Sequence, residues 1–208
     1  MSKIFDLDSP AMRFLTTASE LVLLNLLTVL CSLPVFTVGA AQCGLYYAVR
    51  HLQQDEGAPI KDFFEGFRGN FRQATVLWLL EIVSFVVIAG ALWLYMGQTQ
   101  IVTAIRVAGL LLMGIAVALW ILSFSWLVPL QVSFKNTVFR TVGNALRCGC
   151  ANLLPSISMA VLNLIPLLCW LFRPEWFWML AVLWMAVWFA FTAFLNMKAA
   201  GKVFAAIS

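Results

Sequence analysis

Charged residues are what this sequence has least of. Asp, Glu, Lys and Arg make up only 11% of its 208 residues, whereas soluble domains carry about 25%. Apolar residues make up 63%. So little polar surface cannot cover a particle in water, and lipid must therefore be the solvent around most of the chain. The composition excludes an ordinary soluble domain and predicts an integral membrane protein that contacts the lipid bilayer.

Reactive and metal-binding groups are also scarce. His51 is the single histidine, and the five cysteines form an odd set with no framework spacing, which argues against an extracellular disulfide scaffold. No phosphate-binding glycine loop and no HExxH motif is present. We therefore expect no catalytic site, no metal and no cofactor, so the protein is not expected to be an enzyme. The net charge of +4 is scattered, and no nucleic-acid partner is expected.

Long apolar runs predict the fold class. Each of four runs is about 20 residues long, the length that crosses the hydrocarbon core as a helix. They are residues 74–96, 107–129, 153–172 and 176–195. We expect an all-α, polytopic bundle of transmembrane helices that forms one domain over residues 1–208.

The first apolar region, from Phe14 to Val49, is too long for one straight span at about 1.5 Å per residue. Pro34 and Gly39 interrupt it, because proline removes an intrahelical hydrogen bond and glycine loosens the backbone. We place a span at about residues 18–34 and a second helical piece from Ala40 to His51. Ala40, Gly44 and Ala48 form a ridge of small residues on this piece, which suits close helix packing. The bundle then has about five spans, or six if this region is a full hairpin.

Basic residues in the short loops predict the orientation, because cytoplasmic loops are enriched in Lys and Arg. Alternate loops and the tail hold nine basic residues against two. The nine are Arg50, Lys61, Arg68, Arg72, Lys135, Arg140, Arg147, Lys198 and Lys202, and the two are Arg106 and Arg173. The C-terminus is therefore expected in the cytoplasm. The N-terminus lies outside with five spans and inside with six.

Residues 59–72 have the pattern of an amphipathic helix. Pro59 suits a first helical turn. Phenylalanines recur at helical spacing along the segment, and basic residues accompany them: Phe63, Phe64, Phe67, Phe71, Arg68 and Arg72. This pattern predicts a helix lying in the cytoplasmic interface. It either packs under its own bundle and leads into the second span, or docks a partner protein. Residues 134–147 repeat the pattern more weakly.

A few polar residues lie inside the predicted spans. Glu81 is the one carboxylate well within a clean span, and Ser84 follows one turn later. Asn25 and Asn163 are also expected inside the membrane. A charge at that depth is costly and should face the bundle. These four residues are either an ion or solute site or a set of structural hydrogen-bonding groups between helices.

Several segments in order resemble the YesL family of bacterial membrane proteins, a domain of unknown function (624). They are Asp8-Ser9-Pro10, Asn25-Leu26-Leu27, Cys31-Ser32-Leu33-Pro34-Val35-Phe36-Thr37-Val38-Gly39-Ala40, Leu45-Tyr46-Tyr47, Asp62-Phe63-Phe64 and Asn70-Phe71-Arg72-Gln73-Ala74-Thr75. The resemblance is specific over the first 80 residues. It implies a multi-pass protein of the bacterial cytoplasmic membrane, often encoded beside carbohydrate uptake and breakdown systems. It supplies no catalytic residues.

Two functions are compatible with these features. The first is a non-catalytic accessory protein that contacts the permease subunits of a carbohydrate ABC uptake system through its cytoplasmic face. The alternative is a small solute or ion transporter or channel that uses the intramembrane polar residues. Convergence of those residues on one cavity would favour the transporter, and an exposed Phe63–Phe71 helix would favour the accessory protein. A homo-oligomer is compatible with either function.

The charge asymmetry predicts that the segment from Arg50 to Arg72, the loop from Gln131 to Asn152 and the C-terminus all face the cytoplasm. A cysteine placed at Arg68 or Lys135 should react slowly with an impermeant maleimide added to intact cells. The same cysteine should react readily once the cells are permeabilised. Rapid labelling in intact cells would show that the orientation is wrong.

Overall fold

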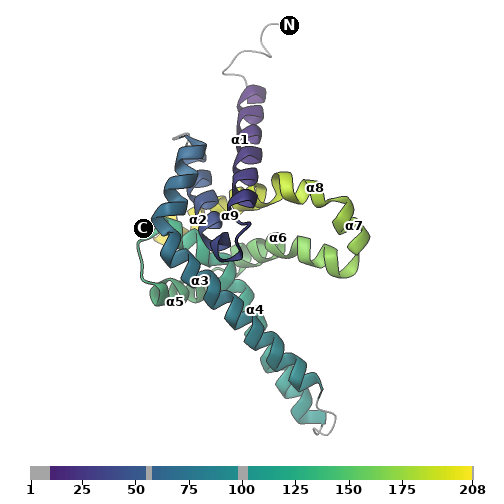
Figure 1. The fold of residues 1–208 in the computed structure, drawn as a ribbon. Helices are drawn as coiled ribbons and strands as arrows, with labels where there is room; N and C mark the ends of the chain where they lie inside the picture. The colour runs from purple at the N-terminus through teal and green to yellow at the C-terminus, as the bar shows by residue number, and fades with distance from the viewer. Residues whose placement is uncertain (1–9, 55–57, 98–102, 208) are drawn as a thin grey trace.

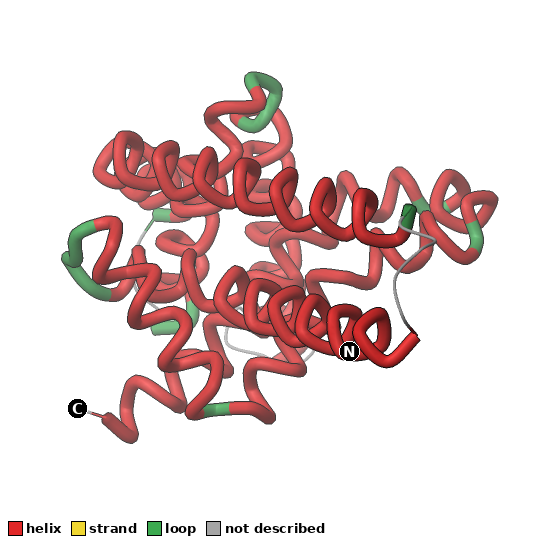
Figure 2. Tube along the Cα trace, turned by 90° about the horizontal axis from the view of Figure 1, so that it is seen from below, coloured by secondary structure: helices red, strands yellow, loops and turns green. Residues whose placement is uncertain are grey.

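The structure, a computed structural model, describes residues 10–54, 58–97 and 103–207. Nearly all of this described chain is helical, with short connections (Figure 2). The helices are α1 (Pro10–Cys31), α2 (Val38–Leu52), α3 (Pro59–Met96), α4 (Thr103–Ser133), α5 (Val138–Ala151), α6 (Leu153–Phe172), α7 (Pro174–Met179), α8 (Ala181–Leu183) and α9 (Phe189–Ile207). A 3₁₀ turn, η1 (Val35–Thr37), precedes α2, and a π-helical turn, η2 (Trp184–Trp188), precedes α9.

Five helical segments are long and apolar enough to cross a membrane. They are Met12–Cys31, Pro59–Met96, Thr103–Ser133, Leu153–Phe172 and Ala181–Ala206. Their outer surfaces are apolar: Val87 of α3 is 62% exposed and Leu111 of α4 is 65% exposed. Side chains of this kind suit contact with acyl chains. The protein is a multi-pass membrane protein. Compared with the sequence prediction, the first helix starts earlier and the last span starts at Ala181.

The N-terminal apolar region is interrupted at Pro34, as the sequence predicted. α1 ends at Cys31, Pro34 is extended, and the Thr37 hydroxyl donates hydrogen bonds to the Cys31 and Pro34 carbonyl oxygens at 2.6 Å each. α2 then turns back alongside α1 (Figure 1). With 15 residues α2 is about 22 Å long, shorter than the roughly 30 Å hydrocarbon core. It is therefore shorter than the five candidate spans, and it turns the chain back beside α1.

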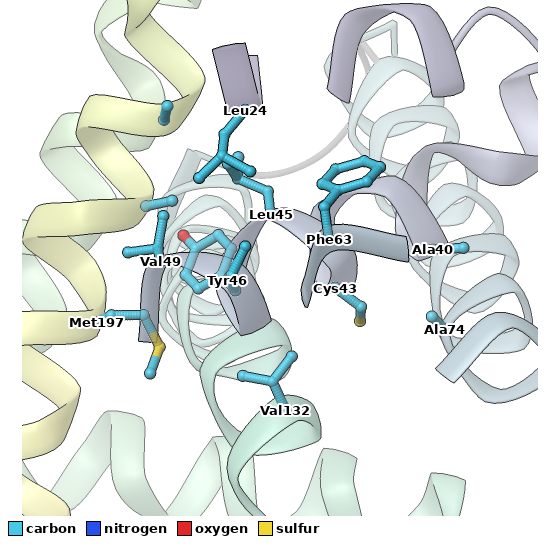
Figure 3. Packing of buried hydrophobic residues seen from close by; sticks show 13 residues of the cluster. Leu24, Ala40, Cys43, Leu45, Tyr46, Val49, Phe63, Ala74, Val132 and Met197 are labelled. Atoms are coloured by element: carbon cyan, nitrogen blue, oxygen red, sulfur yellow. The ribbon is translucent and has the colours of Figure 1, made fainter. Parts of the chain in front are cut away.

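α2 is the most enclosed element of the bundle. Leu24 of α1, Phe63 of α3, Val132 of α4 and Met197 of α9 all pack around it (Figure 3). Small residues on α2 make this packing possible, as the Ala40–Gly44–Ala48 spacing predicts. A β-carbon on Gly44 would lie 2.7 Å from the Phe63 carbonyl oxygen. The backbones of α2 and α3 therefore touch, which a larger side chain would prevent.

The register of α2 against α3 is antiparallel. Gly39, at the start of α2, lies against Ala74, farther along α3. Gly66, nearer the start of α3, lies against Tyr47, near the end of α2. The first half of α3 is therefore committed to α2. Its second half pairs with α4, as the Tyr95 hydroxyl donating to the Ile105 carbonyl oxygen at 3.0 Å shows. The second half of α3 and the part of α4 that pairs with it form an arm that extends away from α2 (Figure 1).

The structure differs from the sequence prediction at residues 59–72. This segment is not a separate helix in the interface but the beginning of α3, which continues without a break to Met96. Nothing between Arg72 and Ala74 ends a helix. Phe63 is fully buried, because Gly44 leaves room for it on α2. The segment therefore packs on its own bundle and leads into the second span.

The weaker repeat of the amphipathic pattern, residues 134–147, falls largely on the short separate helix α5. α5 is amphipathic: Thr141 and Ala145 are buried, whereas Phe139 is 85% exposed. Arg140 and Arg147 are also exposed. An exposed aromatic side chain beside two arginines fits a helix at a membrane surface. The sequence showed the amphipathic pattern in residues 59–72 and in residues 134–147. Only the second segment forms a separate helix, α5, whereas the first is part of α3.

Two glycines on α3 provide a matched test of the α2–α3 contact. A β-carbon on Gly66 would lie 2.5 Å from Tyr47 Cβ, whereas one on Gly69 would meet nothing within 4 Å. Gly66→Ala should therefore lower the stability by about 1–3 kcal/mol through overpacking. Gly69→Ala should be neutral or raise the stability by up to about 1 kcal/mol, because alanine is the better helix former. Thermal unfolding in detergent measures both, and equal melting temperatures would contradict the packing.

Candidate functional site

A small cavity lies where α2, α3 and α4 meet. Its volume is about 30 Å³, and its polar lining consists of Gln42, Glu81 and Gln131. That is room for about one water molecule. Glu81 therefore faces the interior of the bundle, as the cost of an exposed charge in lipid predicts. Its Oε2 atom is buried and has no hydrogen-bond partner among the residues that the structure describes.

Ser84 supports this region without lining the cavity. Its hydroxyl donates to the Glu81 carbonyl oxygen at 2.9 Å and accepts a hydrogen bond from Trp120 Nε1 at 2.8 Å. Both bonds tie α3 to itself and to α4. Ser84 is therefore a helix-pairing residue, and Glu81 alone of this predicted pair faces the cavity.

A second cavity of about 200 Å³ lies beside the first. Its polar lining comes from α2, α4, α6 and α9: Gln42, Tyr46, Ser125, Asn163 and Thr192. Asn196 Nδ2 donates to Asn163 Oδ1 at 3.1 Å and to the Tyr46 hydroxyl at 2.9 Å. This buried network holds Asn163 at the cavity wall. The two cavities share Gln42, Trp78, Phe124 and Val128 as lining residues.

A large open cleft lies at the end of the bundle where α4 meets α5. It has a volume of about 820 Å³, and Arg50, Lys135 and Arg140 line it together with Glu65. Gln131 lines both this cleft and the small cavity that contains Glu81. Gln131 therefore stands between the cleft and the small cavity. Its Nε2 donates to Asn70 Oδ1 at 3.2 Å, which fixes the orientation of the amide.

Asn25 lies away from these cavities and has a structural role. Its Nδ2 donates to the Met185 carbonyl oxygen, and its Oδ1 accepts from the Ala190 amide at 2.8 Å. These two backbone groups are the ones that an i→i+5 bond would join across the π-helical turn η2. The Asn25 carboxamide is inserted between them. Of the four predicted polar residues, Glu81 and Asn163 thus line neighbouring cavities, and Ser84 and Asn25 do not.

The predicted partner surface on residues 63–72 is largely covered. Phe63 is buried, and Phe64, Phe67 and Phe71 are half-buried. The rings form a row, with the Phe67 and Phe71 centroids 5.5 Å apart. Arg68 and Arg72 are exposed, and the Arg68 guanidinium lies 6.0 Å from the Phe64 ring centroid. The aromatic face therefore serves the contact with α2, and only its basic edge is free.

The sequence prediction missed Gln42, Gln131, Tyr46 and Asn196. Gln131 lies just beyond the predicted end of its span at residue 129, and Asn196 lies just beyond residue 195. Gln42 and Tyr46 belong to α2, which was assigned to the membrane only in the six-span alternative. The available signal was polar side chains within one turn of each apolar run. Among the described residues, no group of three or more His, Cys, Asp or Glu side chains could hold a metal ion.

Comparison with known proteins finds one family model that matches part of this arrangement. Residues 21–92 match the family model described as "Protein of unknown function, DUF624". This confirms the resemblance to that domain of unknown function for these residues, which run from the middle of α1 through α2 to near the end of α3. No curated protein and no solved structure matches the chain. The match includes Gln42 and Glu81 but not Gln131 or Asn163.

Variants of Asn25 and Thr28 compare the loss of long-range hydrogen bonds with the loss of a local one within α1. Asn25→Leu leaves the Ala190 amide and the Met185 carbonyl without their partner, which should cost about 1–3 kcal/mol of stability. Thr28→Val removes only a bond to the Leu24 carbonyl oxygen within α1 and should cost clearly less. Melting temperatures in detergent compare the two variants. A larger loss for Thr28→Val would show that Asn25 does not hold the π-helical turn.

Proposed function

We propose that this multi-pass membrane protein, which carries a DUF624 domain over residues 21–92, is a small transporter or channel for a polar solute or ion. The observation that supports it is the succession of three hollows with shared walls. Gln131 belongs to the cleft and to the small cavity, and Gln42 belongs to both inner cavities. A polar route thus leads from the cleft past Glu81 to Asn163. The proposed role involves no catalysis.

The polar groups along this route suit a cation or a hydroxylated solute. Glu81 Oε2 and Gln131 Oε1 are buried oxygen atoms without a hydrogen-bond partner in the described parts of the chain, and both residues line the route. Leaving such an acceptor unpaired costs about 1–3 kcal/mol each. A ligand that donates hydrogen bonds, or a cation, would compensate this cost. Glu81 lines the small cavity, so it would act on a ligand that is held there.

The small cavity is the narrowest point of the route. Its volume of about 30 Å³ admits a water molecule or a bare ion. Trp78 and Phe124 form part of the wall that separates it from the larger cavity. A larger solute would need these two rings to move. We infer that they are the gate of the route and that the cleft is its cytoplasmic entrance, in a bacterial cytoplasmic membrane.

The accessory role beside a carbohydrate ABC permease is a second candidate. The exposed face of α5 favours it, because Phe139 is 85% exposed and Arg140 lies next to it. An aromatic side chain beside arginine is typical of a protein-binding surface. Phe139→Ser should then abolish co-purification of a permease subunit from native membranes. If the same subunit co-purifies with the variant, α5 is not its binding surface.

The transporter proposal predicts flux that depends on Glu81. Proteoliposomes with the full chain should pass at least one of protons, potassium or glycerol faster than protein-free liposomes. Glu81→Gln should reduce that flux about tenfold or more, which corresponds to about 1.4 kcal/mol. Glu175→Gln, at an exposed carboxylate of α7, is the matched control and should leave the flux unchanged. No flux of any of the three probes would refute the proposal.

A further inference from the structure

The cleft has an excess of positive charge. Arg50, Lys135 and Arg140 line it against one carboxylate, Glu65. That carboxylate already accepts a hydrogen bond from the Tyr47 hydroxyl at 3.2 Å. Burial and then the nearby Glu65 raise the pKa of Tyr47, so its hydroxyl remains a donor.

The basic side chains are available for a ligand. Lys135 and Arg140 are exposed, and neither forms an ion pair with any described residue. Arg50 Nη1 donates to the Val132 carbonyl oxygen at 3.2 Å, which anchors the guanidinium at the cleft wall. A second hollow of about 590 Å³ adjoins this cleft, since Phe134, Lys135 and Asn136 line both, and it adds Arg147.

The N-terminus of α5 opens into the same cleft. Asn136, Thr137 and Arg140 line it, and α5 begins at Val138. Thr137 is the N-cap residue, with an extended backbone and no side-chain capping bond. The first amides of a helix lack intrahelical acceptors and carry partial positive charge. With the basic side chains they provide donors for an oxyanion.

The lining of the same cleft contains a buried hydrogen-bond acceptor, which sets a second requirement for the ligand. Gln131 is 6% exposed and lines the cleft, and its Oε1 has no hydrogen-bond donor in the part of the chain that is described. Its Nε2 is held by Asn70, so the oxygen cannot exchange places with the nitrogen without losing that bond. The ionised phosphate of an ester has no hydrogen on its oxygens to offer this atom. A hydroxyl group does.

We propose that the cleft binds a phosphate ester that carries free hydroxyl groups. The phosphate lies among Lys135, Arg140 and the first amides of α5, and a hydroxyl donates to Gln131 Oε1. A water-soluble polyol phosphate and the headgroup of phosphatidylglycerol share this chemistry. The inference goes beyond the transport proposal and does not rest on it, because it concerns equilibrium binding in the cleft alone.

The test uses the purified full chain in neutral detergent, with glycerol 3-phosphate, inorganic phosphate and glycerol as probes in titration calorimetry. Glycerol 3-phosphate should bind tighter than inorganic phosphate, and glycerol alone should not bind. The double variant Lys135→Gln, Arg140→Gln should weaken binding at least tenfold. The matched pair Lys198→Gln, Lys202→Gln removes two exposed charges of α9 that do not line the cleft and should leave binding unchanged.

Gln131→Met isolates the hydroxyl contact. It should reduce the affinity for glycerol 3-phosphate to that for inorganic phosphate and leave the phosphate affinity itself unaltered. A variant that weakens both ligands equally would contradict the assignment of Gln131.

Nanodiscs of phosphatidylcholine with and without phosphatidylglycerol distinguish the two sources. If only the lipid binds, and the Lys135–Arg140 double variant loses it, the ligand is a lipid headgroup. If neither glycerol 3-phosphate nor phosphatidylglycerol binds, or the α9 control pair weakens binding equally, the proposal is overturned. Binding that persists in a protein without flux would refute the transport proposal and leave this one standing.

Discussion

The contact of two helix backbones, α2 against α3, is the constraint on which the rest of the structure depends. Glycine makes it possible from both sides: Gly39 and Gly44 on α2, and Gly66 on α3, have no space for a β-carbon. Lipid tails are as apolar as the side chains they contact, so burial in a membrane supplies little drive for helices to associate. Close packing of backbones, with its many van der Waals contacts, replaces that drive.

This contact also explains why polar groups lie in the middle of the bundle. α2 has only 15 residues, and the helices around it enclose it (Figure 3). It brings Gln42 and Tyr46 to the cavities between α3, α4 and α9. Polar backbone ends and side chains are tolerated at membrane depth only where protein or a polar cavity surrounds them. The inner cavities therefore exist because α2 lies inside the bundle and supplies part of their polar lining.

Much of the fold could be predicted from composition and spacing. The apolar runs identified the long helices, Pro34 identified the break after α1, and the Ala40–Gly44–Ala48 spacing identified a close-packed helix face. Each of these signals is local. At residues 59–72 the alternative of packing under the bundle and leading into the second span agrees with α3, and only the separate helix was wrong. The two alternatives could not be separated from the sequence, because a stripe of phenylalanines looks the same whether it faces lipid or glycines on a neighbouring helix. Only the position of Gly44 opposite Phe63 decides between them, and that pairing is tertiary.

The inserted Asn25 amide gives the membrane assembly of this chain an order. α1 is made first, and its carboxamide has partners, Met185 and Ala190, that are synthesised some 160 residues later. Throughout synthesis this polar group must be accommodated by water or by other transient contacts. When the turn before α9 has been made, its backbone groups supply the missing hydrogen-bond partners of Asn25 in α1. A nascent chain that ends before Met185 would retain an unsatisfied polar group in α1.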